Sequence, residues 1–423
     1  MAKDLFEKCR NFQHPKFLKA LGVYPFFQPI EESEGNRVVC NGQELVMACS
    51  NNYLGLKHDP RVKEAAAQAA MRFGAGCTGS RLLNGNLALH DELEERLAKF
   101  LGKESALVFS TGFLSNLGAI SSLFERGDII YSDADNHASI IAGCKESKAT
   151  VVRYRHADMD DCRAQLATHP QDAAACIITD GVFSMTGRVV DLPSLVKIKS
   201  DHPDVKLYVD DAHGIGVFGQ QGRGVCEHFD CMNHVDLVMG TFSKSLASIG
   251  GFVAGEKDVL NYMRHIARGL LFSAAIPAAS AAAALKALEI IETEPEHRER
   301  LWDNVTYARA ILEDSGVYIM PSDAPILSIW VGGEGLAMKL VADLKEMGVF
   351  ATPVAYPAVP YGQALIRTSY MATHTKEDID CIGHAFKTLA PKHKITRADL
   401  PESPECQPPS PTYNMDALME SFA

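Results

Sequence analysis

The sequence predicts an α/β fold with a large, mainly parallel sheet domain and a smaller C-terminal α/β domain. The first observation is that short apolar runs alternate with helical segments between residues 106 and 240. This alternation is typical of βαβ units, whose helices cover both faces of a parallel sheet. The second observation is that several of these runs end in polar residues, at the strand ends where such sheets bind ligands. With 423 residues, the chain is long enough for two or three packed units.

The composition narrows the class of protein. It contains 47% hydrophobic and 22% charged residues, as a globular enzyme does. The net charge of -12 would repel a nucleic-acid backbone, so no nucleic-acid partner is expected. Eleven cysteines without a CxxC pair predict reduced thiols, with neither a disulfide framework nor a metal site. No signal peptide or membrane-spanning run is found, and a cytoplasmic location is expected.

Four segments are expected along the chain. Residues 1–50 combine a short amphipathic helix, an extended stretch and polar turns, and form an N-terminal arm. Residues 51–294 form the large domain and residues 295–392 the small one. Residues 393–423 are rich in proline and poor in apolar residues, which predicts a disordered tail.

Individual elements follow from apolar runs and helical periodicity. Helices are expected over residues 61–73, over a segment with leucines at 89, 93, 97 and 101, and from about residues 112, 138 and 277. Strands are expected at residues 106–109, 128–131, 151–154, 176–180, 206–210 and 236–240, and in the small domain near residues 326–330 and 364–369.

A lysine stands just after the last predicted strand of the large domain. The segment TFSKSLASIGG begins at Thr241 and places Lys244 among small and hydroxyl residues. An amine in this position can form a Schiff base if partial burial or a nearby cation lowers its pKa. Thr241 and Ser243 can hydrogen-bond a phosphate. A lone lysine in such a loop is more commonly structural, so other signals must decide.

A second polar group ends the strand before it. In LYVDDAHGIGVFG, His213 follows Asp210 by three residues, so both side chains can face one crevice. A carboxylate keeps a pyridine nitrogen protonated and the ring electron-withdrawing, while an imidazole can bond a ring hydroxyl. The alternative is a helix N-cap next to a structural histidine.

Two further strand-to-helix turns carry suitable groups. In STGFLSN, the amides of Gly112 and Phe113 stand at a helix N-terminus and form an anion site suited to a phosphate. An ordinary N-cap by Ser110 or Thr111 would give the same pattern. In DADNHASI, His137 begins a helix and can lie flat on an aromatic cofactor, although a structural role is the commoner one for a single histidine.

One motif is misleading. GAGCTG, residues 74–79, matches the GxGxxG fingerprint of dinucleotide-binding proteins. That fingerprint requires a preceding strand, whereas the residues before this motif predict a helix. A dinucleotide site is therefore rejected, and no GxSxG, Walker A or HExxH motif is present.

Taken together, these motifs resemble the α-oxoamine synthases, a branch of the fold-type I pyridoxal-phosphate (PLP) enzymes related to aspartate aminotransferase. The resemblance covers roughly residues 20–390 and rests on the segments SNNYLGL, GAGCTGSRLLNG, STGFLSNLG, NHASI, TDGVFSMTG, VDDAHGIGVFG, TFSKSLASIGGFVAG, FSAAIP and IRTSYMATHT. It implies a fold-type I PLP-dependent transferase with PLP as its cofactor.

The resemblance also implies roles for individual residues around the cofactor ring. Lys244 would carry PLP as a Schiff base, and His137 would stack on the ring. Asp210 would pair with the pyridine nitrogen and His213 with the ring oxygen. Ser184 matches a position close to the ring.

The same resemblance assigns the phosphate and the substrate. The phosphate would be held by Gly112, Phe113, Thr241 and Ser243. Ser273 matches a residue that reaches the phosphate from a neighbouring subunit, which implies a homodimer with shared sites. Arg367 and Asn51 match the group that binds the amino-acid carboxylate, a task suited to a guanidinium.

The family reaction implied is a decarboxylative condensation of an amino acid with an acyl-CoA. Three segments are most similar in sequence to the serine-using branch of the family: GVYPFFQPI in the arm, TFSKSLASIGGFVAG around the lysine, and MATHT. Enzymes of that branch make 3-ketosphinganine from L-serine and palmitoyl-CoA. Glycine- or alanine-using relatives, of the 8-amino-7-oxononanoate synthase or glycine C-acetyltransferase type, remain alternatives, and an aminotransferase is a more distant one. A scaffold role is disfavoured because the lysine and its partners are retained. A long-chain acyl-CoA is compatible with peripheral membrane contact, although no basic amphipathic helix supports it.

Overall fold

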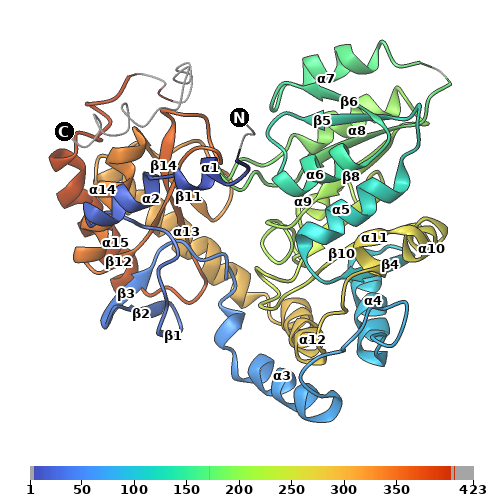
Figure 1. Ribbon diagram of the computed structural model, residues 1–423, viewed down its shortest axis with the longest axis horizontal. Coiled ribbons are helices and arrows are strands. Elements are labelled where there is room, and N and C mark those ends of the chain that lie inside the picture. Colours follow the sequence, from blue (N-terminus) through green and yellow to red (C-terminus); the bar gives the residue numbers. More distant parts are fainter. Residues whose placement is uncertain (1–3, 171, 402–403, 405–423) are drawn as a thin grey trace. The chain divides into compact units, whose positions relative to one another are not determined.

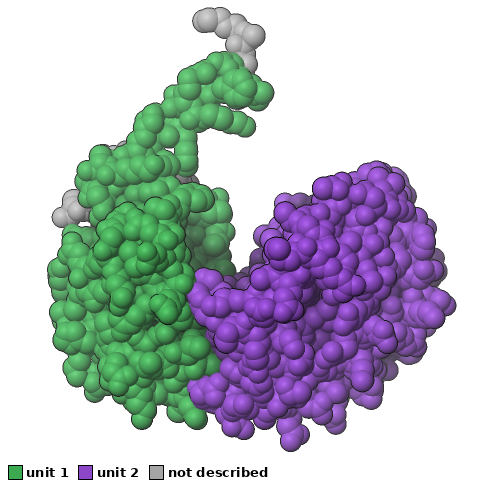
Figure 2. All heavy atoms as spheres, turned by 90° about the horizontal axis from the view of Figure 1, so that it is seen from below, with its two compact units in different colours: residues 1–50, 185–187, 302–423 green, residues 51–184, 188–301 purple. Residues whose placement is uncertain are grey.

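The computed structural model describes residues 4–170, 172–401 and 404 (Figure 1). The chain divides into two compact units, coloured separately in Figure 2. Unit 1 comprises residues 1–50, 185–187 and 302–423, and unit 2 comprises residues 51–184 and 188–301. The segment predicted as an arm is therefore grouped with the C-terminal part of the chain.

The helices and strands of unit 2 include all those predicted for it, and others that were not predicted. They are η1 (Leu56–His58), α3 (Pro60–Phe73), α4 (Ala88–Leu101), β4 (Ser105–Phe109), α5 (Gly112–Leu123), β5 (Ile129–Asp133), α6 (Ala138–Glu146), β6 (Thr150–Tyr154), α7 (Met159–Leu166), β7 (Ala175–Asp180), α8 (Leu192–Ser200), β8 (Lys206–Asp210), α9 (Val225–His228), β9 (Leu237–Thr241), β10 (Gly251–Gly255), α10 (Lys257–Ile266), α11 (Arg268–Leu271) and α12 (Ala278–Thr293). Helix α13 (Glu296–Asp314) begins in unit 2 and continues into unit 1.

The large sheet of unit 2 has the strand order β4-β10-β9-β8-β7-β5-β6. The pairs from β9 to β6 are parallel, whereas β10 runs antiparallel to both of its neighbours. The prediction of a mainly parallel sheet is confirmed. Strand β10 was not predicted, because its sequence, GFVAG, is short and has glycine at both ends.

One face of this sheet packs against α5, α6, α10 and α11. Buried side chains from alternate strand positions, such as Leu107, Ile178 and Met239, form one cluster with Ile120 of α5 and Met263 of α10. Alternation arises because successive side chains of a strand point to opposite faces. The packed helices hold the carboxyl ends of the strands in fixed positions, and the polar residues described below lie at those ends.

Unit 1 contains two smaller sheets. Its elements are α1 (Glu7–Arg10), α2 (His14–Ala20), β1 (Glu32–Glu34), β2 (Arg37–Cys40), β3 (Gln43–Met47), β11 (Ile326–Gly332), α14 (Glu334–Glu346), β12 (Val349–Phe350), β13 (Thr352–Val354), β14 (Ala364–Ser369) and α15 (Lys376–Lys392). The strand orders are β1-β2-β3-β12 and β11-β14-β13. Strands β11 and β14 confirm the two strands predicted for the small domain.

The start of the predicted tail is packed. Ile395 is fully buried, Thr396 pairs with Val317, and the Arg397 amide donates to the Gly316 carbonyl at 2.7 Å. An apolar side chain directly after α15 finds a place in the core, so ordered structure extends past residue 393. Residues 402, 403 and 405–423 of the predicted tail lie outside the described residues. Every helix in the described part of the chain is too short or too polar to cross a membrane.

Candidate active site

The carboxyl ends of β7 and β8 bring two carboxylates side by side in unit 2. Asp180 and Asp210 are direct partners in the register of these strands. The Asp180 carboxylate accepts a hydrogen bond of 2.8 Å from the backbone amide of His137, at the start of α6. Burial, followed by the nearby Asp210 charge, raises the pKa of Asp180 well above its usual value. The carboxyl ends of β5, β7 and β8, three strands adjacent in the sheet, therefore meet here.

A hydrogen-bond chain fixes Asp210. Asn116 of α5 donates through Nδ2 to Asp210 Oδ2 at 2.6 Å, and the Ala212 amide donates to Asp210 Oδ1 at 3.0 Å. Asn116 is itself oriented by the Tyr208 hydroxyl, which donates to its Oδ1 at 2.8 Å. Because both carboxylate oxygens have partners, the side chain has one defined orientation at the strand end.

The same chain reaches His137. Asn116 Nδ2 also lies 2.8 Å from the Ser139 hydroxyl, whose oxygen lies 2.7 Å from His137 Nδ1. Although His137 is exposed, desolvation by the protein atoms around its ring lowers its pKa; Asp210 raises this pKa and Lys244 lowers it. The charges of Asp210 and Lys244 therefore both act on this imidazole.

His213 is held by a tyrosine that the sequence reasoning missed. The hydroxyl of Tyr53, a fully buried residue, lies 2.7 Å from His213 Nδ1 and donates a longer bond of 3.4 Å to Asn51 Oδ1. Two predicted site residues are thus linked through one hydroxyl. Tyr53 belongs to the segment SNNYLGL, from which the sequence analysis selected only Asn51 as a site residue.

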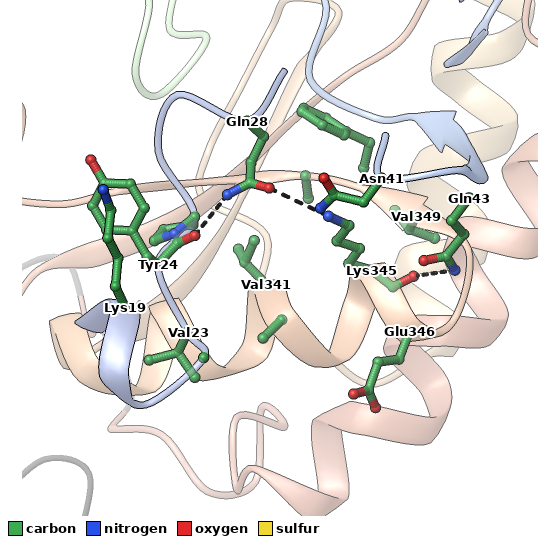
Figure 3. A pocket seen from close by; sticks show the side chains of 15 residues that line it. Lys19, Val23, Tyr24, Gln28, Asn41, Gln43, Val341, Lys345, Glu346 and Val349 are labelled. Atoms are coloured by element: carbon green, nitrogen blue, oxygen red, sulfur yellow. Dashed lines mark hydrogen bonds between the residues drawn. The ribbon is translucent and has the colours of Figure 1, made fainter. Parts of the chain in front are cut away.

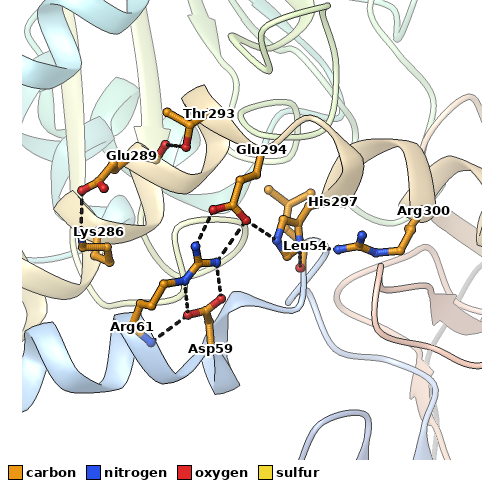
Figure 4. A network of polar contacts seen from close by, with 9 residues as sticks. All are labelled: Leu54, Asp59, Arg61, Lys286, Glu289, Thr293, Glu294, His297 and Arg300. Carbon is orange, nitrogen blue, oxygen red and sulfur yellow. Dashed lines mark hydrogen bonds and ion pairs between the residues drawn. The ribbon is translucent and has the colours of Figure 1, made fainter.

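A network of charges holds the segment that carries Tyr53 (Figure 4). The Arg61 guanidinium bonds both oxygens of Asp59, at 3.0 and 2.8 Å, and also pairs with Glu294 after α12. Next to it, His297 Nδ1 lies 3.2 Å from the carbonyl oxygen of Leu54. This bidentate geometry has a defined direction, so the network orients the segment, although exposed pairs contribute only about 0–1 kcal/mol each to stability.

Lys244 lies in the loop of residues 242–250 between β9 and β10. A bond of 3.0 Å from the Phe242 amide to the Gly250 carbonyl joins the two ends of this loop, and a bond of 3.0 Å from the Ala247 amide to the Lys244 carbonyl lies within it. A Cβ atom at position 250 would come within 2.5 Å of the Phe242 ring, so this position requires glycine. Lys244 is half-buried, and its backbone is therefore fixed beside the strand ends.

The start of α5 lies against the end of β9. A Cβ atom at Gly112 would come within 2.8 Å of Thr241 Oγ1, so only glycine allows this approach. Thr241 Oγ1 lies 3.0 Å from the Ser243 hydroxyl. Thr111 caps the helix by accepting a backbone hydrogen bond of 3.1 Å, and Phe113 is the second residue of the helix. The helix amides and two hydroxyls form a cradle that suits a phosphate.

Ser184, Ser273 and Arg367 are the three remaining predicted site residues. Ser184 follows β7 and is half-buried. Ser273 lies between α11 and α12, next to Ala274, whose carbonyl accepts from the Ser110 hydroxyl. Arg367 is buried in β14 of unit 1, where Ser328 and Thr352 are its register partners. Arg367 belongs to unit 1, whereas all the other predicted site residues belong to unit 2.

Asp211 is a further titratable group that was not selected. It is fully buried, and its Oδ2 accepts a bond of 2.7 Å from the Val225 amide. Burial raises the pKa of Asp211 to about 8. A carboxyl that keeps its proton at neutral pH adds no second negative charge beside Asp210.

This shift predicts a pH-dependent stability. The unfolded carboxyl ionises near its ordinary pKa of 3.8, whereas the folded one keeps its proton up to about pH 8. Over that window the folded state binds more protons, so Asp211 makes stability fall as pH rises, by up to about 1.4 kcal/mol per pH unit. Thermal unfolding of wild type and Asp211→Asn from pH 5 to 9 is the measurement. The difference between the unfolding temperatures of wild type and variant should change to the disadvantage of wild type as the pH rises to about 8, and should then stay constant. Unfolding temperatures that depend on pH in the same way in both proteins would contradict the raised pKa of Asp211.

The fold and this site define a fold-type I PLP-dependent transferase. The family model described as aminotransferase class I and II matches residues 44–386. The chain is 49% identical to the serine palmitoyltransferase of Sphingobacterium spiritivorum, over 89% of this chain and 94% of that protein. It is 40% identical to the 8-amino-7-oxononanoate synthase of Thermoanaerobacter pseudethanolicus, over 89% of this chain and 96% of that protein.

A solved structure gives the same result. The serine palmitoyltransferase of S. paucimobilis, with a bound PLP–myriocin aldimine, aligns with a TM-score of 0.89 and 33% identity, over 92% of this chain and 99% of that one. The chain therefore belongs to the aminotransferase class I and II family, and within it to the α-oxoamine synthases. It is a PLP-dependent acyltransferase, most similar to bacterial serine palmitoyltransferases. The resemblance, fold class and cofactor predicted from the sequence are confirmed.

Proposed function

We propose that this protein condenses L-serine with a long-chain acyl-CoA, palmitoyl-CoA, to give 3-ketosphinganine, CoA and CO2. The observation that carries most weight is its likeness to serine palmitoyltransferases over nearly the whole chain. A glycine- or alanine-using activity is the second candidate, favoured by the likeness to 8-amino-7-oxononanoate synthases.

The strand-end groups fit PLP. When bound, PLP supplies an electron-withdrawing ring that stabilises negative charge at the amino acid's α-carbon. Lys244 Nζ would hold the cofactor's aldehyde carbon in the resting enzyme and carry the α-proton during the reaction. Asp210, fixed by Asn116, would keep the pyridine nitrogen protonated, and His213, held by Tyr53, would bond the ring hydroxyl.

The remaining groups would position cofactor and substrates. The His137 imidazole would lie on the cofactor ring. The hydrogen bond between its Nδ1 and the Ser139 hydroxyl would fix the orientation of the imidazole. Ser184 would contact the ring edge. The phosphate would be held by Gly112, Phe113, Thr241 and Ser243. The substrate carboxylate would be bound by Arg367 and Asn51.

We also propose a homodimer, in which Ser273 of one subunit reaches the phosphate of the other. Its support on this chain is the side chain of Phe272, which is next to Ser273 in the sequence and 81% exposed. The domain bounds at residues 51, 295 and 393 remain proposals. A cytoplasmic location is proposed from the free thiols of the cysteines in the described residues.

The reaction class has a direct test. Purified holoenzyme with L-serine and palmitoyl-CoA should release CoA and CO2 in equal amounts, measured by thiol titration and by trapping of labelled CO2. An aminotransferase would instead convert its cofactor to the pyridoxamine form with the amino donor alone. That spectral change without CoA release would contradict the proposed function.

Asn116 provides a prediction about positioning. In Asn116→Ala, the Tyr208 hydroxyl and Asp210 Oδ2 each lose a buried partner, at a cost of about 1–3 kcal/mol each. We expect kcat to fall about tenfold or more, because Asp210 loses the donor that fixes its orientation. Steady-state kinetics measure kcat and KM separately, and the loss in kcat should exceed any change in KM. Asn261→Ala, on α10, is the control, and an Asn116→Ala variant with the kcat of wild type would contradict the role.

A further inference from the structure

Unit 1 contains a pocket that none of the proposed PLP or substrate residues lines. It has a volume of about 500 Å³ and lies between the arm, the turn after β2 and the C-terminal part of α14 (Figure 3). Small-molecule sites usually measure ~300–1,000 Å³, so its size suits a small organic ligand. Apolar side chains, among them Val23, Val341 and Val349, form much of its wall.

A lysine within this wall has weak partners. Lys345 Nζ lies 3.4 Å from Gln28 Oε1 and 3.4 Å from the thiol of Cys40, which is fully buried. An ammonium group has three donors, and its bonds to oxygen are normally near 2.7–2.9 Å. Lys345 forms no ion pair with a carboxylate of the described residues. Its charge therefore lacks a strong acceptor.

The surrounding groups define the ligand's charge. Gln28 is fixed by a bond of 2.8 Å from its Nε2 to the Tyr24 carbonyl, and Gln43 by one of 3.0 Å to the Lys345 carbonyl. Lys19, with its ammonium 4.9 Å from the centre of the Tyr24 ring, adds a second cation, and Glu346 is exposed at the rim. Two lysines and one glutamate give the lining a net charge of +1, which matches a monoanion better than a dianion.

From these features we propose that the pocket binds a monocarboxylate with an apolar body, the carboxylate pairing with Lys345 and the body lying on the valine wall. A carboxylate would supply the strong acceptor that the ammonium lacks. The apolar body of the ligand would be transferred from water to the apolar valine wall of the pocket, which favours binding. This site is independent of the PLP chemistry, since its residues all belong to unit 1 and none has a role in the proposed reaction.

Octanoate is the probe, and calorimetric titration of the full-length, PLP-loaded protein is the measurement. Wild type should bind octanoate, whereas octylamine, of the same body and opposite charge, should not bind. Phenyl phosphate should bind at least several-fold more weakly. Lys345→Met should weaken octanoate binding by about tenfold or more, and Lys345→Arg should largely retain it.

Lys339→Met is the matched control, because Lys339 is an exposed lysine of the same helix outside the pocket. It should bind octanoate as wild type does. Saturating L-serine should leave the octanoate affinity unchanged. Any of three results would overturn the proposal. Octanoate could fail to bind wild type, bind Lys345→Met with the affinity of wild type, or compete with L-serine. None of these results depends on which amino acid the enzyme condenses.

Discussion

Replacing Lys244 with alanine is expected to lower kcat by at least about 10³-fold and to abolish the absorption band of the lysine-bound cofactor. The residue lies in a loop whose ends are joined by a backbone hydrogen bond, where its charge acts on His137. Removing the amine removes both the covalent link to PLP and the group that moves the α-proton, and a positioned general base alone contributes about 10²–10⁴-fold. Visible spectroscopy and steady-state kinetics are the measurements.

Lys257→Ala is the control for this variant, because Lys257 is an exposed lysine at the start of α10. It should keep both the spectrum and the rate of wild type. An unchanged cofactor spectrum in Lys244→Ala would mean that the cofactor is not bound to this lysine, and the assignment of the whole site would fall.

The second large effect is expected for Asp210→Asn, which should lower kcat by about 10²-fold or more. An amide cannot keep a pyridine nitrogen protonated, so the cofactor ring would withdraw electrons less strongly. The new side chain would also face the Nδ2 donor of Asn116, which now bonds Asp210 Oδ2 at 2.6 Å. Rates and cofactor affinity are measured against Asp258→Asn, a variant of an exposed aspartate on α10. Rates within twofold of wild type would exclude the proposed role.

Much of the large domain could be predicted because each parallel strand is an apolar run followed by polar residues. Strand β8 and Asp210 illustrate this, since the run KLYVD ends at the carboxylate itself. Strand β10 could not be predicted, because its glycines have low strand propensity and its place between β4 and β9 depends on tertiary pairing.

The candidate site was predictable only in part. Lys244, His137 and Asp210 lie at or just beyond the ends of predicted strands or helices, and the carboxyl ends of parallel strands are where ligands usually bind. Asn116 lies inside an ordinary helix sequence, and its importance comes from contacts with Tyr208 and Asp210, both more than 90 residues away. Such contacts leave no local pattern in the sequence.

The most direct test of the central claim is a competition assay on the purified holoenzyme. Equimolar glycine, L-alanine and L-serine would be supplied with acyl-CoA thioesters of increasing chain length, and the products identified by mass. The proposed function predicts that the condensation product of serine with palmitoyl-CoA, 3-ketosphinganine, dominates. A dominant amino ketone from glycine or alanine would contradict the substrate named here while leaving the family and the PLP site in place.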